Sequence, residues 1–461
     1  MVTFQSKNKG FSIINEDLIN FFFQNKNVRE VFNIAQSVDV KIWIVGGAIR
    51  NYLLNQTVND IDFVINIDIE LFLKKISKKN IKINKRNIKY HTISIILDKN
   101  EYQITSFRKD LVTFGRAAHV DFVNGLYEDA KRRDFTINTL YLDHNGNLID
   151  PYNGYQHIIE KKLKFVGDPI ERIREDYLRI IRYCRFFGAF SRFDHLKNLK
   201  SKVLKLLPNI KILSNDRIKK EFLKILLEDK VNICLFKMKS LALDKFILVD
   251  RTNDGKGKEF KGFKINNFEI INHIKRYIID IAQNEKLDLL CVIIPHLYEL
   301  DRLDDIVRRF EFNKKKIKYL NFIKKLQSLK YFIEENNFNE NFSGEKKIKF
   351  LQLIWKFRIN INSSNITIFE NDRIPFNWYK LGLLHMIPFQ TITLADFSDL
   401  DWPSFPLHRN EIKGLQLNMS FNNQNNLLYK AEEFWVKNKF KSSKEDILDF
   451  VNNTLIRNDK V

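Results

Sequence analysis

The sequence contains few of the residues that build disulfide frameworks. Its three cysteines, Cys184, Cys234 and Cys291, lie far apart and form no CxxC pair. This argues against a zinc site and is typical of proteins in a reducing cytoplasm. No apolar run approaches the roughly 18 residues that a membrane-spanning helix needs. The N-terminus also lacks an apolar segment followed by a small-residue cleavage site, so a soluble cytoplasmic protein without a membrane partner is expected.

Acidic residues are scarce relative to basic ones. The 461 residues include 77 Lys and Arg against 56 Asp and Glu, which gives a formal net charge of +21. Such an excess attracts polyanions and favours a nucleic-acid partner, although a solvated basic surface has the same composition. The chain is too long for one compact core, so two to four packed units are expected.

The order of secondary structure predicts a head of mixed α and β structure and then a long, basic helical body. A helix over residues 16–37 is expected to precede the first strand, and the turn residues of 145–154 end the block. From about residue 168 the pattern is helical, with polar breaks at 250–262 and 335–347. The expected strands cover residues 41–47, 61–67, 91–97, 101–107, 119–123 and 139–143.

Two aspartates lie close together in the segment VNDIDFVIN, where Asp60 and Asp62 flank Ile61 on an expected strand. Side chains alternate along a strand, so both carboxylates project from one face, roughly 6.5 Å apart along the chain. Carboxylates this close repel unless a cation lies between them, and Mg²⁺, which takes oxygen ligands and bridges to phosphates, suits that position. A strand edge with two solvated aspartates is the alternative interpretation.

The approach to this pair adds a second signal. The preceding strand runs into Gly46 and Gly47, and Arg50 follows in the first turn of an expected helix. Glycines let the backbone approach a ligand closely, and a helix N-terminus offers free N–H donors to phosphate. The combination predicts one crevice for a nucleoside triphosphate and metal ions.

Three motifs within residues 40–225 resemble a known family. GGAIRNYLL with DID, KRRDFTINTLYLD (131–143) and RIREDYLRIIRYCRF (172–186) have the order and spacing of the class II nucleotidyltransferases, which are the bacterial-type CCA-adding enzymes and bacterial poly(A) polymerases. FPLHRNEIKGL and EEFWVKNKF resemble, less specifically, the tail of CCA-adding enzymes.

This resemblance implies an α+β fold, in which a polymerase-β-like nucleotidyltransferase head with a mixed β-sheet and helices is followed by an all-α neck, body and tail. The implied domains are a head over 1–155, a neck with a nucleotide-selecting helix over 156–230, a body over 231–345 and a tRNA-binding tail over 346–461. The implied reaction adds C, C and A to the 3′ end of tRNA from CTP and ATP and releases pyrophosphate.

The resemblance also implies roles for individual residues. Asp60 and Asp62 would be the catalytic ligands of Mg²⁺. The residues implied to bind the nucleotide are Gly46, Gly47 and Arg50 on the triphosphate, Arg132, Arg133, Asp134 and Asn138 on the ribose and phosphates, and Asp176, Arg179 and Arg182 from the third motif. A plain basic terminus of a helix or strand is the alternative interpretation of RRDFTIN.

The sequence departs from the family at several positions. Asn51 stands where many relatives have Asp, and Gln103 stands where some have an acidic residue. The sequence shows no obvious third carboxylate to act as a base. Glu101, two residues earlier on the same expected strand, is placed to face the same side, and a bound metal ion that lowers the pKa of the attacking hydroxyl is the alternative. Residues 108–120 are interpreted as a loop of the family's length, with Ala117 and Ala118 where polar or proline residues are common.

The third motif, residues 172–186, is interpreted as one helix. Its expected apolar side carries Ile173, Tyr177, Ile180, Ile181, Cys184 and Phe187, and its expected polar side carries Arg172, Glu175, Asp176, Arg179, Arg182 and Tyr183. Ion pairs at helical spacing on a solvated face, such as Arg172 with Glu175, are the alternative interpretation of the polar side.

Base selection follows from hydrogen-bonding patterns. Cytosine and adenine present an amine donor beside a bare ring nitrogen, whereas uracil and guanine present a carbonyl beside a ring N–H. A carboxylate and a guanidinium, supplied by Asp176 and Arg179, would accept the first pair and reject the second. Downstream, Asp216, Arg217 and Glu221 are expected to brace the neck, and the basic, aromatic stretch 308–325 suits an RNA surface or a solvated face.

Three rival functions share parts of this pattern. A poly(A) polymerase, or an enzyme that adds only CC or only A, would have the same head motifs. A non-catalytic RNA-binding protein could retain the head as a scaffold. A nucleotidyltransferase of small molecules would share the Gly-Gly turn and the two aspartates but would not need the +21 charge. No obligate protein partner is inferred.

Overall fold

The computed structural model falls into two compact units, Met1–His273 with Leu297–Phe312, and Ile274–His296 with Asn313–Val461. The candidate site lies in the first unit. The structure describes residues 3–6, 11–14, 16–114, 117–123, 125–248, 262–263, 271, 275, 287–298, 300–326, 345, 348–349, 351–352, 405–407, 411 and 421–458.

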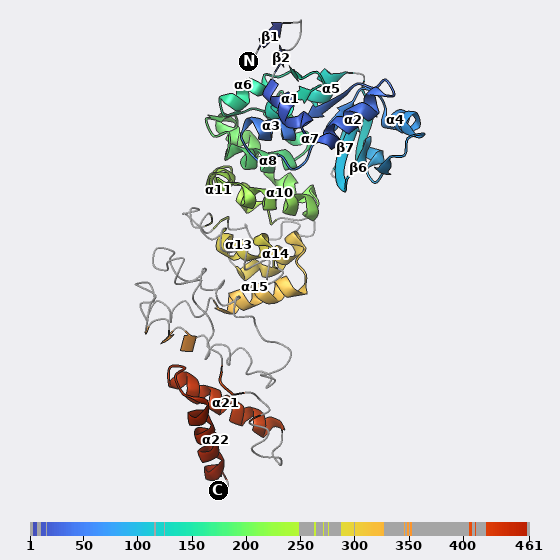
Figure 1. The fold of residues 1–461 in the computed structure, drawn as a ribbon. Coiled ribbons are helices and arrows are strands. Elements are labelled where there is room, and N and C mark those ends of the chain that lie inside the picture. The colour runs from blue at the N-terminus through green and yellow to red at the C-terminus, as the bar shows by residue number, and fades with distance from the viewer. Residues whose placement is uncertain are drawn as a thin grey trace. The chain divides into compact units, whose positions relative to one another are not determined.

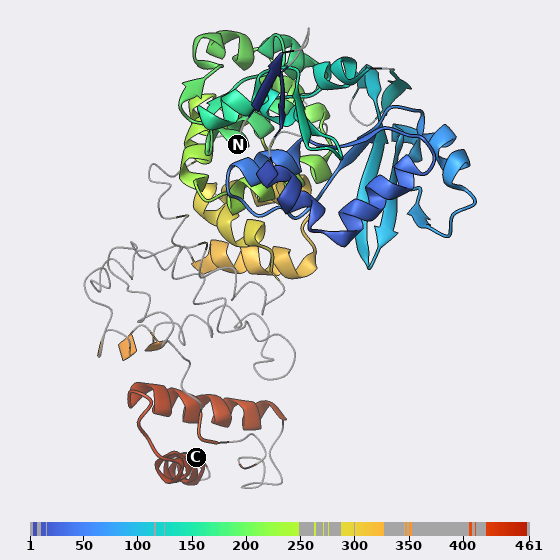
Figure 2. The same ribbon diagram turned by 45° about the horizontal axis from the view of Figure 1, so that its top comes forward.

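A nine-stranded mixed sheet forms the centre of the first unit within these residues (Figures 1 and 2). Strands β4 and β7 are parallel, and the other neighbours in the sheet are antiparallel. In spatial order the strands are β1 (Thr3–Ser6), β2 (Phe11–Ile14), β11 (Asn147–Asp150), β10 (Tyr141–Leu142), β3 (Ile42–Val45), β4 (Phe63–Ile65), β7 (Asn100–Ser106), β6 (Thr92–Leu97) and β5 (Lys82–Asn84). The predicted mixed head is confirmed.

The predicted strands occur with shortened or shifted bounds, and three predictions need correction. The strand expected over 61–67 begins only at Phe63, so Asp60 and Asp62 lie in the segment before it. The loop expected over 108–120 is a separate hairpin of β8 (Arg108–Phe114) and β9 (Ala117–Phe122). Residues 145–154, interpreted as a turn, contain β11.

The helix expected over 16–37 is two helices, α1 (Glu16–Phe23) and α2 (Lys26–Gln36). Asn25 separates them, because its side chain accepts hydrogen bonds from the backbone N–H groups of Asn27 and Val28 and so caps the second helix. The other helices of the head are α3 (Gly47–Leu53), α4 (Ile69–Ile76), α5 (Leu126–Lys131) and α6 (Gly154–Ile159).

Helices continue the first unit after the sheet, as predicted. Helices α8, α10 and α11 pack against one another and lie side by side in Figure 1. The expected all-α neck also holds a short parallel pair, β12 (Lys162–Leu163) and β13 (Phe193–Asp194). The helices are α7 (Pro169–Glu175), α8 (Leu178–Phe187), α9 (Lys200–Leu204), α10 (Asn215–Leu227), α11 (Val231–Ser240) and α14 (Leu303–Phe310).

The second unit is helical where it is described. Helices α21 (Phe421–Lys437) and α22 (Lys444–Asn458) enclose an apolar core around Trp435, Ile447 and Val451. Helix α15 (Lys314–Leu326) and most of α13 (Leu289–Leu297) belong to the same unit. Among the described helices, none is long and apolar enough to cross a membrane. The expected breaks at 250–262 and 335–347 lie almost wholly outside the described residues.

Candidate active site

A cavity of about 370 Å³ opens where the turn after β3, the start of β4 and helices α8 and α10 meet. Nine of the residues named from the sequence line it, namely Gly46, Gly47, Arg50, Asp62, Arg132, Arg133, Asp134, Asn138 and Arg182. Asp60, Asp176 and Arg179 do not. The remaining lining residues are Val45, Phe63, Val64, Gln103, Thr105, Arg108, Arg185 and Lys224. With seven cationic side chains against two carboxylates, the lining suits a polyanion.

The Gly-Gly turn needs glycine at its first position. Gly46 has φ +70, a conformation that residues with a Cβ rarely adopt, and its N–H donates to the Leu140 carbonyl over 3.0 Å. A Cβ there would lie 3.3 Å from both Arg133 Nη1 and the Asn138 carbonyl oxygen. The turn can therefore bring the start of α3 against the RRDFTIN segment only without a side chain.

Arg50 projects from α3 into this cavity. It donates hydrogen bonds to the side-chain oxygens of Asn138 and Asn51, and its guanidinium lies 4.6 Å from the centroid of the Phe186 ring. Burial, together with the positive charges of Arg185 and Arg182, lowers the pKa of Arg50 to about 9. Among the described residues Arg50 forms no ion pair, so its charge is left for a bound anion.

The two aspartates of the DxD segment form the acidic part of the site. The Asp62 carbonyl accepts from the Val45 N–H over 2.9 Å, which anchors the residue beside β3. The side chains of Asp60 and Asp62 are both exposed to solvent. The surrounding protein nevertheless displaces enough water to raise the pKa of Asp62, and the negative charge of Asp60 raises this pKa further. Arg133 and Lys224 oppose this shift. The two carboxylates thus repel each other.

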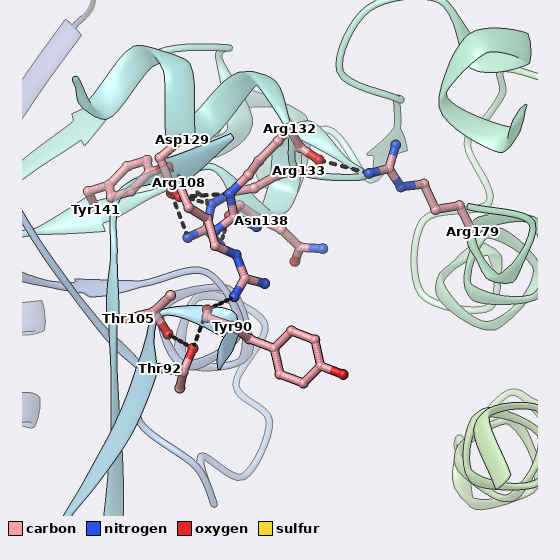
Figure 3. A network of polar contacts seen from close by, with 10 residues as sticks. All are labelled: Tyr90, Thr92, Thr105, Arg108, Asp129, Arg132, Arg133, Asn138, Tyr141 and Arg179. Atoms are coloured by element: carbon pink, nitrogen blue, oxygen red, sulfur yellow. Dashed lines mark hydrogen bonds and ion pairs between the residues drawn. The ribbon is translucent and has the colours of Figure 1, made fainter. Parts of the chain in front are cut away.

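The RRDFTIN segment is held by a carboxylate that the sequence analysis did not single out. Asp129 on α5 is fully buried and forms ion pairs with Arg132 (2.6 Å) and Arg133 (2.9 Å). The Tyr141 hydroxyl also donates to Asp129 over 2.8 Å and accepts from Arg133 Nε, as Figure 3 shows. These positive partners lower the pKa of Asp129 despite burial. Asp129 precedes Arg132 by three residues and Arg133 by four, and this helical spacing is the signal in the sequence that could have revealed the cluster.

Asp134 links the head to α8. Its carboxylate accepts from Asn138 Nδ2 over 2.8 Å and from Arg182 Nε over 2.6 Å. Burial alone would raise its pKa, but Arg182 and the hydrogen bond from Asn138 lower it to about 2. Because Asn138 also accepts from Arg50, the motifs that carry Arg50, Asp134 and Arg182 form one hydrogen-bonded wall.

The third motif is not one helix, which corrects the sequence interpretation. Asp176 ends α7 in an extended conformation, and its side chain accepts from the Leu178 N–H over 3.1 Å at the start of α8. Its second oxygen accepts from Arg217 of α10 over 2.7 Å. A short polar side chain that bonds the backbone two residues on competes with helix continuation, which the helical periodicity could not reveal.

Arg179 therefore does not pair with Asp176. It is buried, bonds Glu175 over 2.6 Å and donates to the Arg132 carbonyl oxygen over 2.8 Å (Figure 3). The sequence placed Arg179 and Tyr183 on a polar face, but the structure buries both. The expected ion pair between Arg172 and Glu175 is present.

Glu101, which the sequence offered as one possible third carboxylate, does not line the cavity. Gln103 and Thr105 of β7 line it, whereas Glu101 accepts from Asn84 Nδ2 over 2.9 Å at an exposed position. Within the described residues, no group of three or more His, Cys, Asp or Glu side chains could hold a metal ion.

Helix α10 contributes residues beyond its expected bracing role. Arg217 bonds Asp176, and Glu221 pairs with Arg185 over 3.0 Å, so the helix braces both ends of α8. One turn after Glu221, Lys224 reaches the cavity. The sequence analysis did not single out Arg108, Arg185 or Lys224, because basic side chains are common throughout the chain.

Comparisons with known proteins agree with this geometry. Residues 42–164 match the Poly A polymerase head domain. Human mitochondrial CCA tRNA nucleotidyltransferase 1 is 36% identical over 210 residues, 45% of this chain and 48% of that protein. The CCA-adding enzyme of Enterococcus faecalis is 35% identical over 204 residues, 44% of this chain and 49% of that protein. The chain thus spans about half the length of these curated relatives.

Solved structures with a similar fold include two CCA-adding enzymes. The Bacillus stearothermophilus CCA-adding enzyme in complex with CTP matches with a TM-score of 0.61 and 19% identity, covering 95% of this chain and 99% of that one. The Thermotoga maritima CCA-adding enzyme complexed with tRNA matches with a TM-score of 0.64 and 16% identity, covering 96% of both chains. Nucleotidyltransferases with this head generally use a divalent metal ion.

Proposed function

We propose that this protein is a template-independent nucleotidyltransferase that adds C, C and A to the 3′ end of tRNA, on the premise that its residues 42–164 match the Poly A polymerase head domain. The observation that carries the proposal is the exposed Asp62, with Asp60 close enough to raise its pKa, at a cavity whose lining has seven cationic side chains against two carboxylates. The two relatives compared above are named for the same addition.

The proposed reaction is the attack of an RNA 3′-hydroxyl oxygen on the α-phosphorus of CTP or ATP. The new phosphorus–oxygen bond forms while the bond to the β-phosphate oxygen breaks, and pyrophosphate leaves. Asp60 and Asp62 would hold Mg²⁺, which when bound would lower the pKa of the attacking hydroxyl and neutralise phosphate charge. Arg50, without a carboxylate partner among the described residues, is suited to a phosphate oxygen.

The remaining nucleotide-binding assignments are part of the same proposal. Gly46 and Gly47 leave room for the triphosphate at the turn. The wall of Arg132, Arg133, Asp134, Asn138 and Arg182 is rigid because its members bond one another, which suits the positioning of ribose and phosphates.

Asp176 and Arg179 are the proposed base-selecting pair, although they bond different neighbours in this structure. A carboxylate can accept about four hydrogen bonds, and Asp176 accepts from Leu178 and Arg217. Arg179 uses only two of its nitrogens in bonds to Arg172, Glu175 and Arg132. Both groups thus retain capacity for a base. An Asp176→Ala enzyme should lose its rejection of UTP and GTP; retained rejection would contradict this assignment.

We also propose the domain plan of a head over 1–155, a neck over 156–230, a body over 231–345 and a tail over 346–461 that contacts tRNA. A cytoplasmic location is part of the proposal. The free, buried thiols of Cys184, Cys234 and Cys291 support it, because a reducing compartment keeps thiols in that state.

The experiment that tests the function is nucleotide incorporation on tRNA that lacks its CCA end, with Mg²⁺ and with CTP, ATP or both. The proposal expects two C residues from CTP alone and a complete three-nucleotide end from the mixture. Because the head family is named for poly(A) polymerase, long A ladders are the specific alternative outcome. Tight tRNA binding without incorporation would identify a non-catalytic RNA-binding protein.

A further inference from the structure

The arginines that line the cavity already have partners inside the protein. Each donates a hydrogen bond to a side chain or a backbone oxygen or, in the case of Arg185, forms an ion pair, and these contacts hold the guanidinium groups in place. The pairs are Arg50 with Asn51 and Asn138, Arg108 with the Tyr90 carbonyl, Arg132 and Arg133 with Asp129, Arg182 with Asp134, and Arg185 with Glu221.

Lys224 differs from all of them. It lines the same cavity from α10, is exposed, and forms no hydrogen bond or ion pair with any residue that the structure describes. Its ammonium group nevertheless interacts electrostatically with both Asp60 and Asp62. Lys224 thus places an uncommitted positive charge beside the acidic pair.

The position is enforced by the helix. Glu221, one turn earlier, is buried against Arg185 of α8, and Phe222 and Ile225 on the same helix are buried in the core. These contacts fix the backbone of α10, so Lys224 keeps its place at the cavity while its four-carbon stem stays free to move. A mobile ammonium with three donors can follow phosphate oxygens that a fixed guanidinium cannot reach.

The surroundings make an anion the expected partner. Arg182 and Arg185 line the same cavity as Lys224, so positive charge surrounds its ammonium group. A cation held at Asp60 and Asp62 would offset two of the negative charges near Lys224, and the third, Glu221, is already paired with Arg185. A polyphosphate that binds with that cation would supply negative charge to both the cation and Lys224.

We propose that Lys224 is a substrate-binding residue that contacts the triphosphate of the incoming nucleotide and stays in contact with the pyrophosphate that leaves. This inference rests on the proposed function and adds a contact from α10 to it. Because phosphates are common to CTP and ATP, the contribution of Lys224 is the same for both nucleotides and independent of the base.

The test compares Lys224→Gln, Lys224→Arg and the wild-type chain. The matched control is Lys220→Gln, one turn earlier on α10, where the side chain is largely exposed and paired with Asp216. The readouts are KM and kcat for CTP and ATP, KM for tRNA, and the dissociation constant of inorganic tripolyphosphate measured by calorimetry.

Lys224→Gln should raise KM for CTP and ATP by the same factor, roughly 10- to 100-fold, which is the range for a lost charge-assisted hydrogen bond. Tripolyphosphate affinity should fall by a similar factor, while KM for tRNA stays unchanged. Lys224→Arg should restore most of both, and Lys220→Gln should match wild type. Unchanged tripolyphosphate affinity in Lys224→Gln, or KM effects that differ between CTP and ATP, would overturn the inference.

The two proposals can fail separately. Wild-type protein that incorporates no nucleotide, yet binds tripolyphosphate through Lys224, would sink the proposed function and keep the polyphosphate contact. An active enzyme whose Lys224→Gln variant binds tripolyphosphate normally would support the proposed function and overturn the assignment of Lys224.

Discussion

Asp62 and Asp129 both interact with Arg133, and the protein treats them in opposite ways. Asp129 is fully buried, bonds Arg132, Arg133 and Tyr141, and has a lowered pKa. Asp62 reaches solvent at the cavity, and its pKa is raised by burial of its surroundings and by Asp60. The Asp129 carboxylate is paired within the fold, whereas the Asp62 carboxylate is exposed at the cavity.

The difference indicates that the Asp129 cluster positions other residues, whereas Asp60 and Asp62 are the proposed metal ligands. The Asp129 cluster orders the RRDFTIN segment, whose next residue Asp134 carries the link to Arg182. A rigid, internally neutralised cluster positions its neighbours well but cannot bind a cation, because its lone pairs are used. Asp60 and Asp62 keep their oxygen lone pairs available, and the two carboxylates repel each other. Substitutions at the two places should therefore have different consequences.

The largest expected effect is on catalysis by the acidic pair. Asp62→Asn and Asp60→Asn should each lower incorporation on trimmed tRNA by roughly a thousandfold or more, because the metal supplies several kcal/mol of transition-state stabilisation. Single-turnover incorporation at saturating CTP measures this loss. Near-wild-type rates in either variant would place the metal elsewhere.

Asp129→Asn should act on stability instead. Removing one partner of a buried ion pair leaves an uncompensated charge, which costs about 3–5 kcal/mol, and here two arginines lose their partner. Urea unfolding should show a lower midpoint at unchanged slope. A loss below about 1 kcal/mol would mean that the arginines find other partners or reach water.

Tyr141→Phe tests the same cluster more gently. The hydroxyl donates to Asp129 and accepts from Arg133, so its removal should cost about 1–2 kcal/mol of unfolding free energy. The charges remain paired, so incorporation should fall less than in Asp62→Asn. Equal damage from Tyr141→Phe and Asp129→Asn would show that the hydroxyl, rather than the charge, holds the cluster.

The smallest effect is a difference in how stability depends on pH. A carboxylate with a lowered pKa stabilises the fold above its ordinary value of 3.8, and this contribution is lost as pH falls through the folded-state value, which for Asp134 is about 2. Asp62, with a raised pKa, instead subtracts stability at neutral pH and recovers it on protonation.

Melting temperatures at pH 7 and pH 4 should reveal this contrast. Asp62→Asn should melt a few degrees at most above wild type at pH 7, with a smaller gain at pH 4. Asp129→Asn should melt well below wild type at both. A lower melting temperature for Asp62→Asn at pH 7 would show that Asp62 is structurally satisfied.

The sequence predicts the parts of the site that depend on short-range order. The turn at Gly46, the neighbouring Asp60 and Asp62, and the strands that flank them follow from local spacing. The mixed head and the helical remainder follow from periodicity. These features need no knowledge of which distant segments meet.

Long-range features were out of reach for the same reason. The break at Asp176 depends on a side-chain bond to Leu178 and on Arg217, which lies 41 residues away along the chain. The placement of Lys224 beside Asp62 depends on how α10 packs on α8. Arg179 is buried because it bonds the carbonyl of Arg132, a contact that helical periodicity cannot indicate.

Binding of Mn²⁺ in the presence of tripolyphosphate, followed by electron paramagnetic resonance, tests the central claim most directly. The wild-type protein should bind Mn²⁺ tightly only when the polyphosphate is added. Asp60→Asn and Asp62→Asn should lose that binding. The folded fraction of Asp129→Asn should keep it. Undiminished Mn²⁺ binding by both Asp60→Asn and Asp62→Asn would contradict the account.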